Sequence, residues 1–143
     1  MLTTKARNSL IAVAGIGLIV IDQAAKYLVY TKGFGGFLMH LRPVFGLLIF
    51  PNKDFAFSLK IPIAIIYLIY FILIALLLVW FARQQPKTLR LKIGLALVLA
   101  GAVSNIYDRV ALGYVRDFIY VFWGNIFNLA DLYIVGGILT LLF

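Results

Sequence analysis

Apolar and polar positions along the chain divide it into four long apolar stretches separated by short polar segments. The clearest stretch covers residues 61–82 and contains no charged side chain. As an α-helix of about 22 residues it would rise ~33 Å and cross a hydrocarbon core of ~30 Å. Pro62 falls in its first turn, where a missing backbone N–H is tolerated. We expect this helix to provide packing and no polar group.

The first apolar run, residues 10–21, follows Lys5 and Arg7 and has the charge and length of the n- and h-regions of a secretory signal peptide. However, the apolar pattern resumes after Asp22 and Lys26, and no small-residue cleavage site follows. The sequence therefore favours a membrane helix over residues 9–30.

Two further stretches complete the predicted helices. Residues 93–112 form an apolar run with polar residues towards its end, and residues 128–143 form the shortest run. The latter, as a helix of about 16 residues, would rise ~24 Å, so it needs a locally thinner bilayer to span. We expect a mainly α membrane protein with a single integral membrane domain over residues 1–143. Residues 31–60, which are aromatic and turn-rich, are expected to form a loop with two or more short strands.

Composition supports a membrane protein. Hydrophobic residues make up 64% and charged residues 13%, against ~45–50% and ~25% in soluble domains, which excludes a soluble globular or disordered chain. The net charge is +8, but the basic residues lie at the ends of apolar runs, where they suit anionic headgroups rather than nucleic acid. With no Cys and a single His, neither a disulfide framework nor a thiolate or His-rich metal site is expected.

Basic residues also predict the orientation. The N-terminal segment and residues 83–92 together hold six of them: Lys5, Arg7, Arg83, Lys87, Arg90 and Lys92. The positive-inside rule assigns these segments to the cytoplasm. Both termini are then inside, and residues 31–60 lie outside. The remaining basic residues of the connecting segments are assigned to the outer side: Lys32, Arg42, Lys53, Lys60 and Arg116.

Polar residues of three predicted helices fall at one depth. Asp22 lies 12 residues from Leu10, Asn105 lies 12 from Ile93, and Asp131 lies 12 from Phe143. Each would sit ~18 Å above the inner end of its helix. Helical spacing adds neighbours on the same faces, which are Lys26, Asp108, Arg109 and Asn128. A charge in a membrane helix normally faces the bundle interior and a partner, so we expect one polar cavity towards the outer leaflet.

Such a cavity supports several interpretations. Two Asp side chains held close share one proton, and the ionised member can then activate water, but spacing does not say which Asp residues pair. The alternatives are purely structural roles: an ion pair of Asp22 with Lys26, interhelical hydrogen bonds, and Asn128 as a helix N-cap. At the level of the whole protein, a small ion or solute carrier and a non-catalytic membrane scaffold compete with an enzyme. Aromatic residues near the outer ends, Tyr30 among them, are expected to form an interfacial belt.

Four blocks of the sequence resemble signal peptidase II, the lipoprotein signal peptidase of bacteria. These are DQAAK at residues 22–26, NKDFAFS at 52–58, GAVSNIYDRVALGYVRDF at 101–118 and FNLAD at 127–131. The resemblance implies an intramembrane aspartyl protease with four helices and a small extracytoplasmic β-rich cradle. It places a catalytic dyad at Asp117, expected in a short loop, and Asp131. It gives support roles to Asp22, Lys26, Asn52, Asn105, Asp108, Arg109 and Asn128.

The same resemblance implies a substrate and a location. The substrate is a prolipoprotein that carries a diacylglyceryl group on its lipobox Cys, and the cut falls just before that Cys. No cofactor or metal is implied, and globomycin-type cyclic peptides are the implied inhibitors. The protein would act as a monomer in the bacterial cytoplasmic membrane, in contact with membrane lipid and with its active site outward. In this chain Lys53, Asp54 and Phe55 replace the family's usual Thr, Gly and Ala after Asn52.

Overall fold

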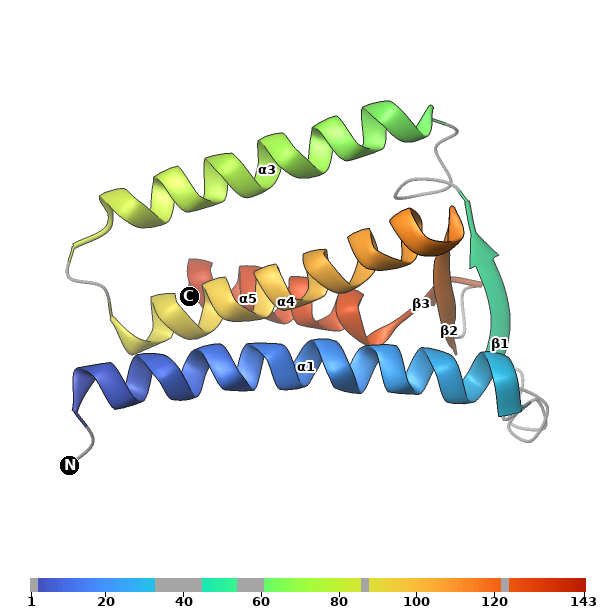
Figure 1. The fold of residues 1–143 in the computed structure, drawn as a ribbon, viewed down its shortest axis with the longest axis horizontal. Coiled ribbons are helices and arrows are strands. Elements are labelled where there is room, and N and C mark those ends of the chain that lie inside the picture. Colours follow the sequence, from blue (N-terminus) through green and yellow to red (C-terminus); the bar gives the residue numbers. More distant parts are fainter. Residues whose placement is uncertain (1–2, 33–44, 54–60, 86–87, 122–123) are drawn as a thin grey trace.

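The computed structural model describes residues 3–32, 45–53, 61–85, 88–121 and 124–143. In this part of the chain, four helices run side by side and a small sheet closes one end of the bundle (Figure 1). The helices are α1 (Thr4–Lys32), α3 (Ile63–Arg83), α4 (Leu89–Leu112) and α5 (Leu129–Leu142), and the strands are β1 (Phe45–Asn52), β2 (Val115–Val121) and β3 (Ile126–Phe127). The predicted fold class, a mainly helical membrane protein with a small sheet, is confirmed.

Three of these helices, α1, α3 and α4, are long and apolar enough to cross a membrane. The fourth, α5, has 14 residues and rises only ~21 Å, which makes it slightly shorter than the run over residues 128–143 expected from the sequence. Both chain ends lie at the end of the bundle opposite the sheet (Figure 1).

Local capping explains where the helices begin and end. Helix α4 begins four residues before the apolar run predicted, because the Thr88 side chain accepts a hydrogen bond from the backbone N–H of Leu91 at 3.3 Å. It ends at Gly113, whose φ of 80° is the left-handed conformation that glycine adopts easily. Helix α1 begins at Thr4, so it includes the basic residues that precede the apolar run.

The three strands form an antiparallel sheet in the order β1-β2-β3. Strand β1 is the one strand that the described part of residues 31–60 contains, and residues 33–44 and 54–60 lie outside the described residues. Strands β2 and β3 form a hairpin between α4 and α5, which pairs Ile119 with Phe127. The sequence prediction of a loop around Asp117 was therefore wrong, because pairing with β1, some 65 residues away in the chain at Asn52, makes this segment a strand.

Helix α4 forms the centre of the bundle and packs against α1 and most closely against α5. At Gly101, an added Cβ would collide with the Ala130 carbonyl oxygen and lie 2.7 Å from Cγ1 of Ile134. A Cβ at Gly137 would lie 2.8 Å from the carbonyl oxygen of Gly94. Small residues thus allow the two backbones to approach closely, as is common between membrane helices. This approach sets the start of α5 against the middle of α4.

Candidate active site

Two carboxylates of the predicted site lie at the junction of the sheet and the bundle. Asp117 is on the central strand β2, and Asp131 is in the first turn of α5. The β2–β3 hairpin connects them, because its register brings Phe127 beside Ile119 and so returns Asn128 towards the start of β2. Asp117 is 2% exposed.

Asn128 joins the two carboxylates. Its Nδ2 donates a hydrogen bond to Oδ1 of Asp117 at 2.6 Å. Its Oδ1 accepts from the backbone N–H of Asp131 at 3.0 Å, and its own backbone N–H donates to Oδ2 of Asp131 at 3.1 Å. The last two bonds are a reciprocal N-terminal cap of α5. One fully buried side chain therefore caps the helix and fixes the position of Asp117 relative to Asp131.

Asn105 of α4 supports the same pair from within the bundle. Its Oδ1 accepts from Nζ of Lys26 at 3.0 Å, and its Nδ2 donates to Oδ1 of Asp131 at 2.8 Å. Because the Lys26 ammonium can only donate, it fixes the orientation of the Asn105 amide and aims the Nδ2 group at the carboxylate. Both oxygens of Asp131 thus accept hydrogen bonds from groups whose orientation other contacts determine.

Asn52, at the end of β1, completes the hydrogen bonds to Asp117. Its Nδ2 donates to Oδ2 of Asp117 at 2.7 Å. In the register, Phe50 faces Asp117 and Asn52 faces Val115, so Asn52 is a diagonal neighbour on the same face of the sheet. The changed residues that follow Asn52 therefore do not prevent this contact.

A buried ion cluster, formed by Asp22, Lys26, Asp108 and Arg116, lies next to the carboxylates. Lys26 contacts Asp22 at 2.7 Å and Asp108 at 3.1 Å, and all three side chains are fully buried. Oδ1 of Asp22 also accepts from the backbone N–H of Ala130 at 3.0 Å, which adds a negative charge near the N-terminus of α5. The cluster ties α1, α4 and α5 together at the depth that the sequence predicted for the polar layer.

Arg116 is a member of this cluster that the sequence analysis missed. Its Nη2 atom lies 2.7 Å from Oδ1 of Asp108 and 2.6 Å from Oε1 of Gln23, and its backbone N–H donates to Oδ2 of Asp108 at 3.0 Å. Gln23 and Ser104 were also missed; Oγ of Ser104 donates to Oδ2 of Asp22 at 2.6 Å. Gln23, Ser104 and Arg116 are the sequence neighbours of the predicted site residues Asp22, Asn105 and Asp117. This adjacency was the signal that could have identified them. Counting Arg116 only as an outer-loop charge hid its role.

Helix α3 contributes one polar group, contrary to the expectation that it provides packing alone. The Tyr70 hydroxyl accepts a hydrogen bond from Nη1 of Arg109 at 3.0 Å, and the guanidinium lies 5.5 Å from the centroid of the Tyr70 ring. Arg109 is 6% exposed. The phenol ring was overlooked because a long, uncharged apolar run dominates the pattern. Tyr30, expected in an interfacial belt, donates its O–H to the backbone carbonyl of Asp117 at 3.0 Å.

Apart from Arg109, the residues predicted for the site form one continuous set of hydrogen bonds and ion pairs. The set runs from Asn52 through Asp117, Asn128, Asp131, Asn105 and Lys26 to Asp22 and Asp108.

Burial raises the pKa of the Asp117 carboxyl to about 6. The hydrogen bond from Asn52 opposes this rise, and the negative charge of Asp131 adds to it. A carboxyl with such a pKa can exchange a proton near neutral pH. Among the described residues, no group of three or more His, Cys, Asp or Glu side chains is arranged to hold a metal ion.

Comparisons with known proteins show the family of this chain. A sequence model of the family described as "Signal peptidase (SPase) II" matches residues 14–143. The lipoprotein signal peptidase of Pseudoalteromonas translucida is 38% identical over 135 residues, which cover 88% of this chain and 81% of that protein. The lipoprotein signal peptidase of Bartonella henselae is 36% identical over 138 residues, covering 89% and 84%.

Two solved structures of bacterial membrane enzymes, both obtained by the in meso method, are similar in fold. One, at 2.3 Å resolution, has a TM-score of 0.79 and 26% identity and covers 94% of this chain and 84% of its own. The other, at 1.9 Å resolution, has a TM-score of 0.77 and covers 94% and 89%. With the family match over residues 14–143, these findings establish that the chain belongs to the signal peptidase II family of multi-pass membrane peptidases.

Proposed function

We propose that this protein is an aspartyl endopeptidase that removes the signal peptide from diacylglyceryl-modified prolipoproteins and cuts just before the lipidated Cys. The observation that carries the proposal is the pair of carboxylates formed by the buried Asp117 and the half-buried Asp131, which Asn128 links by hydrogen bonds to both. Membership of the lipoprotein signal peptidase family supports the substrate class.

The reaction uses the two carboxyl groups in different protonation states. Close carboxylates cannot both ionise easily, so the pair holds one proton. The ionised member takes a proton from a water molecule, whose oxygen attacks the scissile carbonyl carbon. The protonated member donates a hydrogen bond to the carbonyl oxygen. When the C–N bond breaks, the departing amine receives a proton from the pair, and the signal peptide leaves with a new carboxyl group.

The surrounding residues act as supports in this proposal. Asn105 donates to Asp131 and Asn52 donates to Asp117, and these hydrogen bonds restrict the rotation of each carboxyl group. The Lys26 ammonium, 3.0 Å from Oδ1 of Asn105, places a positive charge behind the pair and favours its ionised member. Asn and Arg side chains at this depth, Arg109 among them, can bind backbone groups of a substrate that has lost its helical hydrogen bonds.

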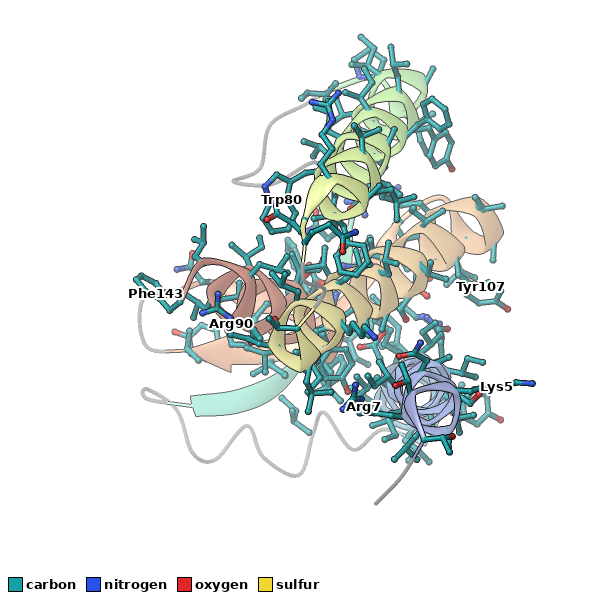
Figure 2. All side chains as sticks on the ribbon, turned by 90° about the vertical axis from the view of Figure 1, so that its left-hand side faces the viewer. Lys5, Arg7, Trp80, Arg90, Tyr107 and Phe143 are labelled. Atoms are coloured by element: carbon teal, nitrogen blue, oxygen red, sulfur yellow. The ribbon has the colours of Figure 1, made fainter. Side chains whose placement is uncertain are left out.

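The location follows from the arrangement of charges. The chain ends and the basic residues Lys5, Arg7 and Arg90 lie at the end of the bundle opposite the sheet (Figures 1 and 2). By the positive-inside rule we infer that the carboxylates lie towards the extracytoplasmic side of the cytoplasmic membrane. We expect the enzyme to work as a monomer. We also expect globomycin-type cyclic peptides to inhibit it.

A cleavage assay tests the proposal. The purified protein is incubated in detergent micelles with a lipidated prolipoprotein, and product masses are measured. We expect two products, with the lipidated Cys as the new N-terminus, and no products from Asp117→Asn or Asp131→Asn. Asp54→Asn, the same substitution at an Asp outside the described residues, is the control and should cleave normally. Thermal unfolding checks that each variant is folded.

The same assay separates the alternatives. Cleavage that survives both Asn substitutions would show that another group performs the hydrolysis. Absence of cleavage combined with solute or ion flux into protein-containing vesicles would favour a carrier, whose buried charges would then act as a proton relay.

A further inference from the structure

An apolar groove lies at the end of the bundle far from the carboxylates. It has a volume of about 620 Å³ and lies between the N-terminal half of α1, the C-terminal end of α3 and the N-terminal half of α4. Its lining includes Asn8, Ala12 and Ile19 from α1, Phe81 from α3, and Lys92 and Leu99 from α4. This volume falls within the range of ~300–1,000 Å³ that is typical of sites for small ligands.

The length and polarity of the groove match one leaflet of a bilayer. Its lining on α1 runs from Asn8 to Ile19 and on α4 from Lys92 to Val103, so each wall extends ~17 Å along its helix. This is about half of a hydrocarbon core of ~30 Å. The polar lining residues lie at one end, where Nζ of Lys92 donates a hydrogen bond to Oδ1 of Asn8 at 2.8 Å. The remainder of the lining is apolar, and it ends near mid-membrane.

The charge at this end determines which occupant fits. The first turns of α1 and α4 hold no acidic residue, and the last turn of α3 holds Arg83. Figure 2 views the bundle from this end and shows Lys5, Arg7 and Arg90 there as well. A signal peptide carries positive charge in its n-region, so Lys92 would repel it. An anionic headgroup would instead be attracted by about 1 kcal/mol per nearby basic residue.

We propose that this groove is a binding site for one anionic phospholipid. An acyl chain lies between α1, α3 and α4, and the phosphate binds the Lys92 ammonium at the mouth. The lipid would fill the space beside α3, which packs chiefly against α4, and would so stabilise the position of α3 in the bundle. The proposal does not depend on catalysis, since the groove is built from other residues than the carboxylate pair.

Native mass spectrometry of the detergent-solubilised protein tests the headgroup contact. Phosphatidylglycerol and phosphatidylcholine with the same acyl chains are titrated separately. We expect one tightly retained phosphatidylglycerol and weaker retention of phosphatidylcholine. Lys92→Gln should reduce phosphatidylglycerol affinity about fivefold. Lys5→Gln is the matched control, because it removes the same charge from an exposed position at the same end outside the groove, and it should lower the affinity clearly less than Lys92→Gln does.

A second pair of variants tests the acyl chain. Ala12→Phe places a ring into the groove, whereas Val13→Phe places the same ring on the neighbouring exposed position of α1 outside it. Only Ala12→Phe should weaken lipid retention. Bound phosphatidylglycerol should also raise the unfolding temperature of the wild type more than that of the Ala12→Phe variant.

Three results would overturn the proposal. The first is an equal effect of Lys92→Gln and Lys5→Gln, which would indicate general attraction to the charged end. The second is equal retention of the two lipids. The third is displacement of the retained lipid by a synthetic signal peptide, which would assign the groove to the substrate. Inorganic phosphate at millimolar concentration should not compete, because it lacks the acyl chain that occupies the groove.

Discussion

Replacing Asn128 by Ala tests the link between the two carboxylates. The wild-type side chain donates to Asp117 at 2.6 Å and accepts from the backbone N–H of Asp131 at 3.0 Å. Ala removes both bonds, together with the 3.2 Å bond from Nδ2 of Asn128 to Oδ1 of Asn105, and leaves the carboxyl groups themselves in place. The variant should therefore be less stable, and Asp117 should titrate differently, while no catalytic group has been deleted.

The magnitudes follow from the lost helix cap and the lost hydrogen bond to Asp117. Loss of the helix cap costs about 1 kcal/mol of unfolding free energy. A hydrogen bond to a charged group contributes about 1.5–3 kcal/mol, and one pKa unit corresponds to ~1.4 kcal/mol. The hydrogen bond from Asn128 lowers the pKa of Asp117, which is about 6 in the wild type. Its removal should raise that pKa by about 1–2 units, because the ionised carboxylate loses a donor.

The assay is the pH dependence of kcat/KM for cleavage of a lipidated prolipoprotein, measured below the unfolding temperature of the variants. The range from about pH 4.5 to 9 brackets the titration of Asp117. The limb of the profile that Asp117 governs should move to higher pH, whether Asp117 acts as the base or as the acid. Thr88→Ala is the control, because Thr88 caps α4 through one hydrogen bond of 3.3 Å far from the site. It should lower stability by about 1 kcal/mol and leave the profile unchanged. If the Asn128→Ala and Thr88→Ala profiles coincide, Asn128 does not act on the carboxylates.

Three other substitutions test the supports. Asp22→Ala leaves Lys26 without its closest buried partner, at 2.7 Å in the wild type, and should lower the free energy of unfolding by about 3–5 kcal/mol; a loss below about 1 kcal/mol in denaturant titrations would contradict a buried pair. Gly101→Ala should prevent normal folding, because the added Cβ would collide with α5. Gly17→Ala is the control, with no heavy atom within 4 Å of the added Cβ, and should raise helix stability by about 0.5–1 kcal/mol. Equal unfolding temperatures of the two variants would refute the close packing of α4 against α5. Arg116→Leu should reduce kcat more than it raises KM, with partial rescue by Lys, because Arg116 positions β2 rather than the substrate; a change confined to KM would contradict this role.

Much of the helical architecture could be predicted because membrane helices must be long and apolar. The run of residues 61–82 corresponds closely to α3 at Ile63–Arg83. The ends were less predictable. Helix α4 begins at Leu89 because Thr88 caps it, and basic residues such as Lys92 remain helical where their side chains reach the polar end of the bundle.

The strands could not be located from the pattern alone. Strand β2 carries Asp117 and pairs with β1, a segment that lies far earlier in the chain, on the other side of α3 and α4. Such pairing depends on partners distant in sequence, and a short strand beside two helices leaves little periodicity of its own. The two-residue strand β3 leaves still less.

The site was predictable where charges lie within apolar runs. Asp22, Asn105 and Asp131 fell at one predicted depth, and the structure joins them through Lys26 and Ala130. Residues outside the runs were harder to find. Arg116 had been assigned to the outer loops, although its neighbour Asp117 was identified.

The most direct test of the central claim is a double-mutant cycle on the two carboxylates. Cleavage rates are measured by product mass for the wild type, Asp117→Asn, Asp131→Asn and the double variant. If the two groups act as one unit on a single water molecule, each single substitution should lower kcat by about 10²–10⁴-fold, and the double variant should lose little more than either single one. Losses that multiply in the double variant, or a single variant that retains wild-type cleavage, would contradict the account.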